Sequence, residues 1–346
     1  MNALPEIREN VALDNLNTLR VPARARWFCE ITGQDELLAV ADWARTRRLR
    51  TLLLGGGSNL VFTGDFDGLV VAMAIRGRRW ESVSGDQATL VLKAGENWHE
   101  SVLYAASSGF RGIENLALIP GTVGAAPIQN IGAYGVELCD TLESVTVYDA
   151  RTGDIRVLKA PGCCFGYRDS IFKHESNRYI VLELRLRLSR SRPLSLGYGE
   201  LADYFSGRQE KDEPTPLEVA KAVMAIRRRK LPDPVQLPNA GSFFKNPVLG
   251  LSQWQHLKEQ WPEMPGYPVG DRMKVPAAWL IDQSGWRGYR NERVGVHNRQ
   301  ALVLINHSGG TGRDILELAE RIRKDVEQRY GITLEREPGI IESDAR

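Results

Sequence analysis

The feature that most constrains the fold is a long glycine-rich segment at residues 119–135. It contains Gly121, Gly124, Gly132 and Gly135. Glycine at this density disfavours a continuous helix or strand, so the segment is predicted to be an ordered loop. Its small side chains leave the backbone able to lie against a flat ring system. We therefore expect the chain to fold around a loop that holds a ligand.

A second glycine turn directly follows an apolar run, residues 51–54, that is predicted to be a strand. It reads Gly55-Gly56-Gly57-Ser58-Asn59. Such a turn lets backbone N–H groups converge, which suits the pyrophosphate of a dinucleotide, although a tight connection without a ligand is an equally simple reading. Leu60 stands where G-x-G-x-x-G would have its last glycine, and no G-x-x-x-x-G-K-[ST] loop occurs. Neither a Rossmann nor a Walker site is supported.

Hydrophobic periodicity and turn signals give a coarse map of mixed helices and strands. Strands are predicted at residues 69–73, 89–93 and 179–188, a hairpin at 144–148 and 155–158, and a helix at 98–108. Capping boxes start two further helices, at Thr215 and at Thr311, the second ending at Gly331. A domain boundary is predicted near residue 205. The segment 332–341 is expected to be extended and to return to the first unit or the active site.

Composition narrows the class of partner. A chain of 346 residues has room for two or three packed units, and a formal charge of +2 favours a small anionic ligand over a polyanion. The basic runs 76–79 and 227–230 lack interleaved aromatic residues, so they do not predict RNA binding. We interpret the arginines of the second run as cations at a helix C-terminus. No secretory leader, membrane span, zinc spacing or disulfide framework is predicted, which favours a cytoplasmic protein with free thiols and no metal.

Seven motifs between about residues 52 and 306 together resemble a known family. In chain order they are LGGGSNL, IPGTVGAAPIQNIGAYG, GYRDSIFK, LPDP, NAGSFFKNP, LIDQSGW and VGVHNRQALVLIN. The sequence is similar to the UDP-N-acetylenolpyruvoylglucosamine reductases, flavoenzymes that make UDP-N-acetylmuramic acid for bacterial peptidoglycan. An insertion between Pro247 and Pro276 resembles the larger of the family's two types, in which a tyrosine loop folds over the bound nucleotide.

The resemblance implies an α+β fold of the vanillyl-alcohol-oxidase type, with two FAD-binding subdomains and a third, α/β domain for the substrate. The expected divisions are residues 1–75, joined by 332–346, then 76–205, then 206–331. FAD is expected to bind non-covalently. The implied cofactor-binding residues are those of the two glycine segments: Gly55, Gly56, Gly57, Ser58, Asn59, Ile119, Pro120, Gly121, Thr122, Gly124, Ala125, Gly132 and Tyr134.

The resemblance also implies three catalytic residues. Arg168 of Gly-Tyr-Arg-Asp-Ser would stabilise the enolate that develops as the enol ether accepts hydride. Ser242 of Asn-Ala-Gly-Ser would donate the proton, a task a hydroxyl can perform only when it is held close and dry. Glu337 matches the family's C-terminal glutamate, with Glu335 as the substitute, because Pro338-Gly339 departs from the family pattern. Without the motifs, an arginine would be read as a surface ion pair and a serine as a loop residue.

Five residues are implied to bind the UDP-sugar: Tyr167, Tyr198, Lys230, Asn246 and Tyr267. Core packing of the tyrosines and helix capping by the lysine remain as alternatives. The implied reaction is the NADPH-dependent, FAD-mediated reduction of UDP-N-acetylglucosamine enolpyruvate, in which donor and substrate use one pocket in turn. Another flavin oxidoreductase of this fold, or a nucleotide-sugar-binding protein without catalysis, stays open. The expected partners are small molecules, without nucleic acid or membrane. A monomer is one option for the oligomeric state.

Overall fold

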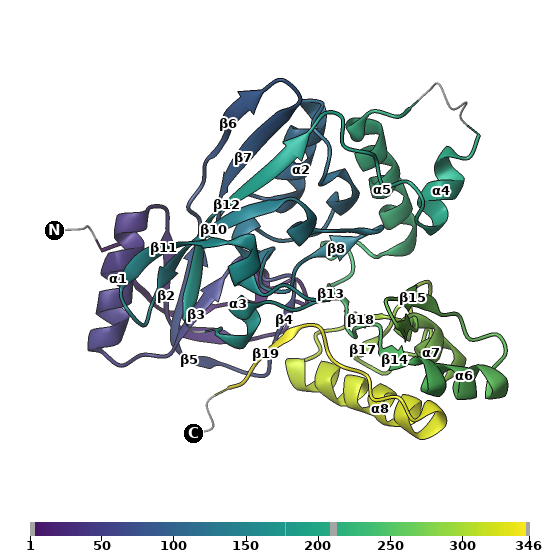
Figure 1. Ribbon diagram of the computed structural model, residues 1–346. Helices are drawn as coiled ribbons and strands as arrows, with labels where there is room; N and C mark the ends of the chain where they lie inside the picture. The colour runs from purple at the N-terminus through teal and green to yellow at the C-terminus, as the bar shows by residue number, and fades with distance from the viewer. Residues whose placement is uncertain (1–3, 177, 208–212, 344–346) are drawn as a thin grey trace. The chain divides into compact units, whose positions relative to one another are not determined.

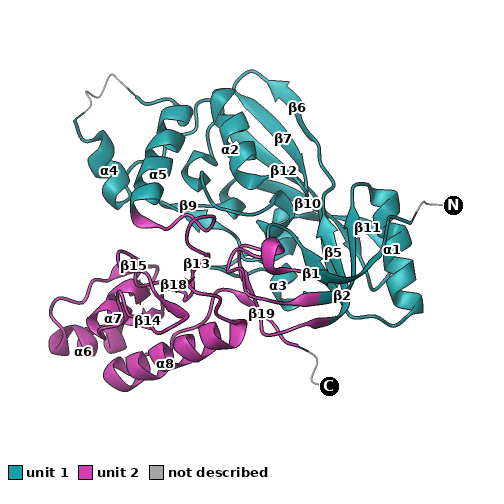
Figure 2. Cartoon of the chain, turned by 180° about the vertical axis from the view of Figure 1, so that it is seen from behind, with its two compact units in different colours: residues 1–11, 25–56, 67–229 teal, residues 12–24, 57–66, 230–346 magenta. Residues whose placement is uncertain are grey.

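The computed structural model describes residues 4–176, 178–207 and 213–343. The chain forms two compact units (Figure 2). Unit 1 is drawn from residues 1–11, 25–56 and 67–229, and unit 2 from residues 12–24, 57–66 and 230–346. Among the described residues, no helix combines the length and the apolar character that crossing a bilayer requires.

The larger sheet of unit 1 has the strand order β11-β10-β12-β7-β6, with antiparallel neighbours throughout (Figure 1). Its strands are β6 (Arg78–Ser84), β7 (Gln87–Lys93), β10 (Leu142–Asp149), β11 (Asp154–Lys159) and β12 (Tyr179–Ser189). The predicted hairpin and the predicted strands are confirmed. Apolar side chains of this sheet share one core with α2 (Trp98–Ser107), which matches the predicted helix.

The second sheet of unit 1 has the order β1-β2-β5-β3. Its strands are β1 (Arg8–Ala12), β2 (Arg24–Ile31), β3 (Thr51–Leu54) and β5 (Phe66–Met73), and β3 runs parallel to β5. Helix α1 (Gln34–Thr46) contributes Leu37, Val40 and Ala44 to a small core with Leu69 and Val71. Because these three helical positions are three and four residues apart, they form one apolar stripe. The C-terminal end of β3 and the first two glycines after it, Gly55 and Gly56, belong to unit 1.

Helices α4 (Gly199–Phe205) and α5 (Pro216–Lys230) also belong largely to unit 1. Thr215 and Glu218 form the predicted capping box, in which the Thr215 N–H donates to a Glu218 carboxylate oxygen at 2.8 Å. Buried side chains of α5, including Val219, Val223 and Ile226, join the core of the larger sheet. The division between the two units therefore falls at residues 229 and 230, later than the predicted boundary near residue 205. The predicted three-part division stays a prediction.

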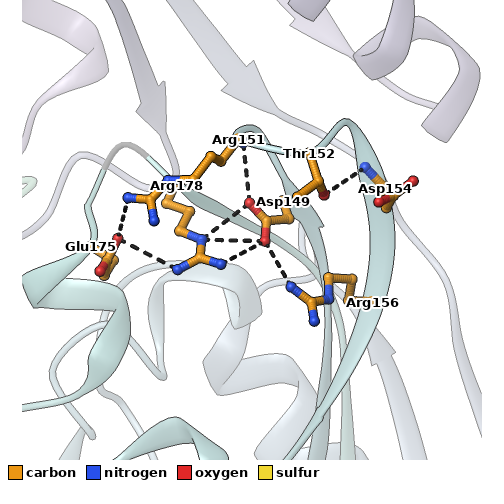
Figure 3. Close-up of polar contacts among 7 residues, drawn as sticks. All are labelled: Asp149, Arg151, Thr152, Asp154, Arg156, Glu175 and Arg178. Atoms are coloured by element: carbon orange, nitrogen blue, oxygen red, sulfur yellow. Dashed lines mark hydrogen bonds and ion pairs between the residues drawn. The ribbon is translucent and has the colours of Figure 1, made fainter.

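A buried carboxylate fastens the tip of the β10–β11 hairpin (Figure 3). The Asp149 side chain is fully buried and accepts hydrogen bonds from Arg178 Nη2 at 3.1 Å and Arg156 Nη1 at 3.1 Å. Arg151 and Arg178 also pair with Glu175. These hydrogen bonds, that from Arg178 foremost, lower the pKa of Asp149 to about 2. The carboxylate thus stays ionised and holds the turn at neutral pH.

Unit 2 contains two three-stranded antiparallel sheets. One has the order β13-β18-β17, with β13 (Asn239–Ser242), β17 (Val294–Val296) and β18 (Val303–Asn306). The other has the order β14-β16-β15, with β14 (Val248–Gly250), β15 (Tyr267–Val269) and β16 (Arg272–Lys274). The helices of unit 2 are α6 (Leu251–Gln260), α7 (Ala277–Gln283) and α8 (Gly312–Tyr330).

The ends of α8 follow the predicted signals. Thr311 and Asp314 form a capping box at its start, and Gly331 ends it in the left-handed conformation, φ +63°. Beyond it, β19 (Gly339–Ile341) pairs in parallel with β4 (Leu60–Phe62). The C-terminal segment thus returns to residues 60–62, which lie within the predicted first subdomain of residues 1–75 but belong to unit 2. Before β19, residues 335–337 form backbone hydrogen bonds with residues 243–245 of unit 2.

Candidate active site

The two glycine segments meet backbone to backbone in unit 1. A Cβ atom added at Gly56 would lie 2.8 Å from Gly121 Cα, and one at Gly55 would lie 2.5 Å from Thr122 Oγ1. Both distances are shorter than ordinary van der Waals contact, so these positions accept only glycine without movement. The Thr122 hydroxyl is buried, and within the described part of the chain it has no hydrogen-bond partner. A crowded backbone cradle with an unsatisfied polar atom suits a ligand that brings its own hydrogen-bonding groups.

Backbone hydrogen bonds hold the second glycine segment in place. Gly121 O accepts from Trp98 N at 3.1 Å, Val123 N donates to Glu96 O at 2.9 Å, and Gly124 N donates to Ala94 O at 2.8 Å. The indole N–H of the fully buried Trp98 donates to Leu116 O at 3.1 Å. Pro120 and Ala125 are exposed, and Ile119 is half-buried. The start of α2 thus fixes the part of the loop that faces Gly55 and Gly56.

The first glycine turn continues into unit 2. Gly57 has φ +60°, and a Cβ there would lie 2.0 Å from Leu16 O. Its carbonyl accepts from Thr18 N at 3.0 Å, and Asn59 O accepts from Gly339 N at 3.0 Å. Ser58 is half-buried between them. The predicted cofactor residues Gly57, Ser58 and Asn59 are therefore held by backbone of unit 2.

Arg168 lies on a tight loop that fastens it to the second glycine segment. Gly166 and Asp169 exchange backbone hydrogen bonds at 3.1 and 3.2 Å, and Arg168 between them has φ +53°. Its Nη2 donates to Gly132 O at 2.7 Å, and its guanidinium lies 5.3 Å from the centre of the Tyr167 ring. The Ser170 hydroxyl donates to Ile128 O at 2.6 Å. Within unit 1 the predicted catalytic arginine is thus brought to the predicted cofactor residue Gly132.

A predicted substrate residue is also brought to the glycine segment. The rings of Tyr134 and Tyr198 meet edge to face at 5.9 Å. Sequence reasoning missed the residue that fixes this pair: Asn115 is fully buried, and its Nδ2 donates to Tyr134 O at 2.9 Å and to Ser195 O at 2.8 Å. Tyr198 is 51% exposed, so core packing does not account for it.

The basic run 227–230 forms the last turn of α5, as predicted, but Arg227 differs from its exposed neighbours Arg228 and Arg229 in its burial. Its Nε atom is buried, and among the described residues this atom has no hydrogen-bond partner. Burial lowers the pKa of the guanidinium, which interacts electrostatically with Tyr134 and Arg168. The sequence contains a signal for this burial: Arg227 lies four residues after the buried Val223, on the same face of the helix. Arg229, in contrast, pairs with Glu200 at 2.5 Å.

In unit 2 the structure places Ser242 and Glu337 on adjacent backbone. Ser242 ends β13 after Gly241, whose φ is +71° and whose N–H donates to Asn239 Oδ1 at 2.9 Å. Glu337 N donates to Phe243 O at 2.9 Å, directly after Ser242. Glu335 is exposed and its carboxylate pairs with Lys245 Nζ. Glu337 is thus bonded through its backbone next to Ser242, and which of the two acids acts there stays a prediction.

The other predicted substrate residues of unit 2 have distinct surroundings. Lys230 is the last residue of α5 and is half-buried. Asn246 Oδ1 accepts from Ala277 N at 2.9 Å, so it satisfies the first amide of α7. Tyr267 on β15 is 55% exposed, which argues against core packing. Their roles toward a ligand stay predictions.

Comparisons with known proteins agree with this arrangement. Residues 26–159 match the model of an FAD binding domain, and residues 233–341 match that of the UDP-N-acetylenolpyruvoylglucosamine reductase C-terminal domain. The chain is 46% identical over 341 residues to the UDP-N-acetylenolpyruvoylglucosamine reductase of Pseudomonas aeruginosa, covering 97% of this chain and 99% of the relative. The chain belongs to this reductase family. The Chromobacterium violaceum reductase is 47% identical over 339 residues, again covering 97% and 99%.

Solved structures show the same fold. The UDP-N-acetylenolpyruvylglucosamine reductase of Thermus caldophilus superposes with a TM-score of 0.66 at 24% identity, covering 97% of this chain and 99% of that one. A solvent-stable cholesterol oxidase superposes with a TM-score of 0.50 at 13% identity, covering 97% and 88%. The family resemblance drawn from the seven motifs is confirmed, and so is the α+β FAD-binding fold of the vanillyl-alcohol-oxidase type.

Proposed function

We propose that this chain is a UDP-N-acetylmuramate dehydrogenase, which reduces UDP-N-acetylglucosamine enolpyruvate with electrons from NADPH by way of FAD in peptidoglycan precursor synthesis. The observation that carries the proposal is a sequence identity of 46–47% to reductases of this family over 97% of the chain. Membership alone leaves open which residues act. The local geometry of each unit supports their assignment.

The residues present fit a bound FAD. The glycine cradle of Gly55, Gly56 and Gly121 leaves room only for backbone, and the buried Thr122 hydroxyl is available to a ligand. Backbone N–H groups of such turns suit the pyrophosphate, while the segment that ends at Tyr134 suits the flat ring system. Bound there, FAD would supply hydride transfer from NADPH to the vinyl carbon of the sugar. The protein's own groups must orient the acceptor and supply charge and a proton.

Arg168 supplies the charge. Negative charge grows on the substrate's carboxylate as its double bond is reduced, and a fixed guanidinium stabilises that charge more in the transition state than in the ground state. The hydrogen bond to Gly132 O and the Tyr167 ring fix the orientation of the guanidinium before the substrate arrives. Less reorganisation is then needed during the reaction.

Ser242 supplies the proton to the carbon next to the carboxylate. An enolate is basic enough to take a proton from a hydroxyl that is held in position and kept from water. The Asn239 side chain and the left-handed Gly241 fix the turn that precedes Ser242, and the Phe243–Glu337 hydrogen bond fixes the residue after it. We propose that Glu337, whose backbone is bonded to Phe243, assists the same hydroxyl.

Substrate recognition uses Tyr167, Tyr198, Lys230, Asn246 and Tyr267. NADPH and the enolpyruvyl sugar occupy the site in turn, which predicts ping-pong kinetics. Both partners are small nucleotide anions, and the chain's formal charge of +2 favours them over nucleic acid. We place the reaction in the cytoplasm and expect it to need no second copy of the chain.

Separate measurement of the two half-reactions tests the proposal. Ser242→Ala keeps the charge of Arg168 but removes the proton, so we expect NADPH to reduce the flavin at the wild-type rate and the substrate to reoxidise it at least about 100-fold more slowly. Stopped-flow absorbance follows both steps. The matched control is Ser284→Ala, which removes a hydroxyl of the same unit that donates to Leu280 O at 2.8 Å at the end of α7. Loss of the NADPH step in Ser242→Ala, or unchanged reoxidation, would contradict the proton-donor role.

A further inference from the structure

A half-buried acid, Glu137, lies beside Arg168 at Gly132. Glu137 lies on β9 (Val136–Glu137), and its register partner on β8 (Gly132–Ala133) is Gly132. A Cβ added at Gly132 would lie 2.9 Å from Glu137 Cγ and 3.1 Å from Arg168 Nη1. The two side chains therefore lie against the same point of the glycine backbone, and they interact electrostatically.

Asn130 ties this acid to the loop of Arg168. It is fully buried and has φ +45°. Its Nδ2 donates to Glu137 Oε2 at 2.8 Å and to Gly166 O at 3.2 Å, and its Oδ1 accepts from Cys139 N at 3.1 Å. Gly166 comes two residues before Arg168. The acid is thus linked to the loop of the arginine through Asn130, and both side chains lie against Gly132.

Charge balance explains why an acid lies at this position. Arg168 interacts with a second half-buried cation, Arg227, and like charges repel. Burial is the main factor that raises the pKa of Glu137, Asp140 raises it too, and Arg168 opposes both. Because partial burial disfavours a charged carboxylate, we expect the ionised form of Glu137 to be paired with a cation.

We propose that Glu137 is a positioning residue, which acts through Gly132 and Asn130 to hold the Arg168 guanidinium in the orientation that the substrate's carboxylate needs. The inference rests on the role proposed above for Arg168. It assigns Glu137 no contact with substrate or cofactor. It predicts that the step in which the substrate is reduced depends on Glu137, whereas the step in which NADPH is consumed does not.

The test variant is Glu137→Gln, which retains an oxygen for the Asn130 bond but removes the charge. Because a small displacement of a catalytic group is costly, we expect reoxidation by the enolpyruvyl sugar to slow about 10- to 100-fold, with NADPH reduction within about twofold of wild type. Calorimetric binding of UDP-N-acetylmuramate gives a readout apart from turnover, and it should weaken about tenfold. Glu137→Asp keeps the charge and should lie between Glu137→Gln and wild type.

The matched control is Glu143→Gln. Glu143 lies on β10 of the same unit and also pairs with arginines, Arg185 at 3.9 Å and Arg187 at 3.7 Å. Its loss should leave both half-reactions unchanged. Wild-type reoxidation by Glu137→Gln would overturn the inference. If Glu137→Gln loses stability, the folded Glu137→Asp variant decides, and an equal loss of both half-reactions there would also overturn it.

Arg168→Lys separates this inference from the proposed function. If Arg168→Lys reoxidises normally, the proposed role of Arg168 is wrong. If it is slow while Glu137→Gln is normal, only the positioning role of Glu137 fails. A double variant should be no slower than Arg168→Lys alone, because Glu137 acts through the arginine. Additive slowing would show that Glu137 acts by another route.

Discussion

Gly56→Ala tests whether the close approach of the two glycine segments forms the flavin site. The added Cβ would lie 2.8 Å from Gly121 Cα, whereas carbon atoms in contact prefer about 3.5–4.0 Å. One segment must therefore move by nearly an ångström. The second is held by the Trp98–Gly121 backbone hydrogen bond, so the strain cannot relax freely. Overpacking of this kind costs about 1–3 kcal/mol.

The same displacement should weaken the binding of the flavin. If FAD lies against both segments, a cost of about 1–3 kcal/mol corresponds to about 5- to 150-fold weaker binding. Urea unfolding of the apoprotein measures the stability change, and quenching of flavin fluorescence measures the dissociation constant. Gly162→Ala is the matched control: Gly162 is exposed, and a Cβ there meets nothing within 4 Å. It should leave flavin affinity unchanged.

Two results would refute this reasoning. Flavin affinity of Gly56→Ala equal to that of wild type, with a measurable loss of stability, would show that the segments pack but do not bind the cofactor. No loss of either would show that the segments are further apart or more yielding than the structure indicates.

Two further predictions concern stability. The pKa of Asp149 is lowered from 3.8 to about 2, so its contribution to stability is present above about pH 4 and is lost as the pH falls toward 2. Asp149→Asn should therefore destabilise the protein at neutral pH and flatten this acid-dependent loss, as measured by urea unfolding across pH 2–5. An unchanged pH profile would contradict the role of the Asp149 contacts in Figure 3. Thr311→Ala removes the hydroxyl that accepts from Asp314 N at 3.2 Å, which should lower the free energy of unfolding by about 1 kcal/mol. Equal midpoints for that variant and wild type would argue against the cap.

Local signals predicted local structure well. The capping boxes at Thr215 and Thr311 mark the starts of α5 and α8 because a hydroxyl and an acid three residues apart satisfy the first amides of a helix whatever surrounds it. The alternation of β12 and the hairpin of β10 and β11 follow equally local rules. Ordered motifs led to the family, while the roles of its site residues stay predictions.

Other parts of the site depend on contacts between distant segments. Nothing near Glu137 in the sequence shows that its side chain shares Gly132 with Arg168, because the arginine comes from a different loop. Arg227 was not singled out because it stands in a run of basic residues, although its four-residue spacing from Val223 indicated that it lies on the buried face of the helix. The predicted boundary near residue 205 rests on a change in local sequence character, whereas the two compact units divide after α5 because that helix packs on the larger sheet.

The central claim is that electrons reach the enolpyruvyl sugar through a bound flavin. The most direct measurement is the visible absorbance of the purified protein under anaerobic conditions, titrated first with NADPH and then with UDP-N-acetylglucosamine enolpyruvate. Bleaching by about one equivalent of NADPH and full return of the absorbance on adding about one equivalent of the sugar are expected from a two-electron flavin couple. A protein that reduces the sugar without any flavin absorbance, or whose bleached flavin does not respond to the sugar, would contradict the claim.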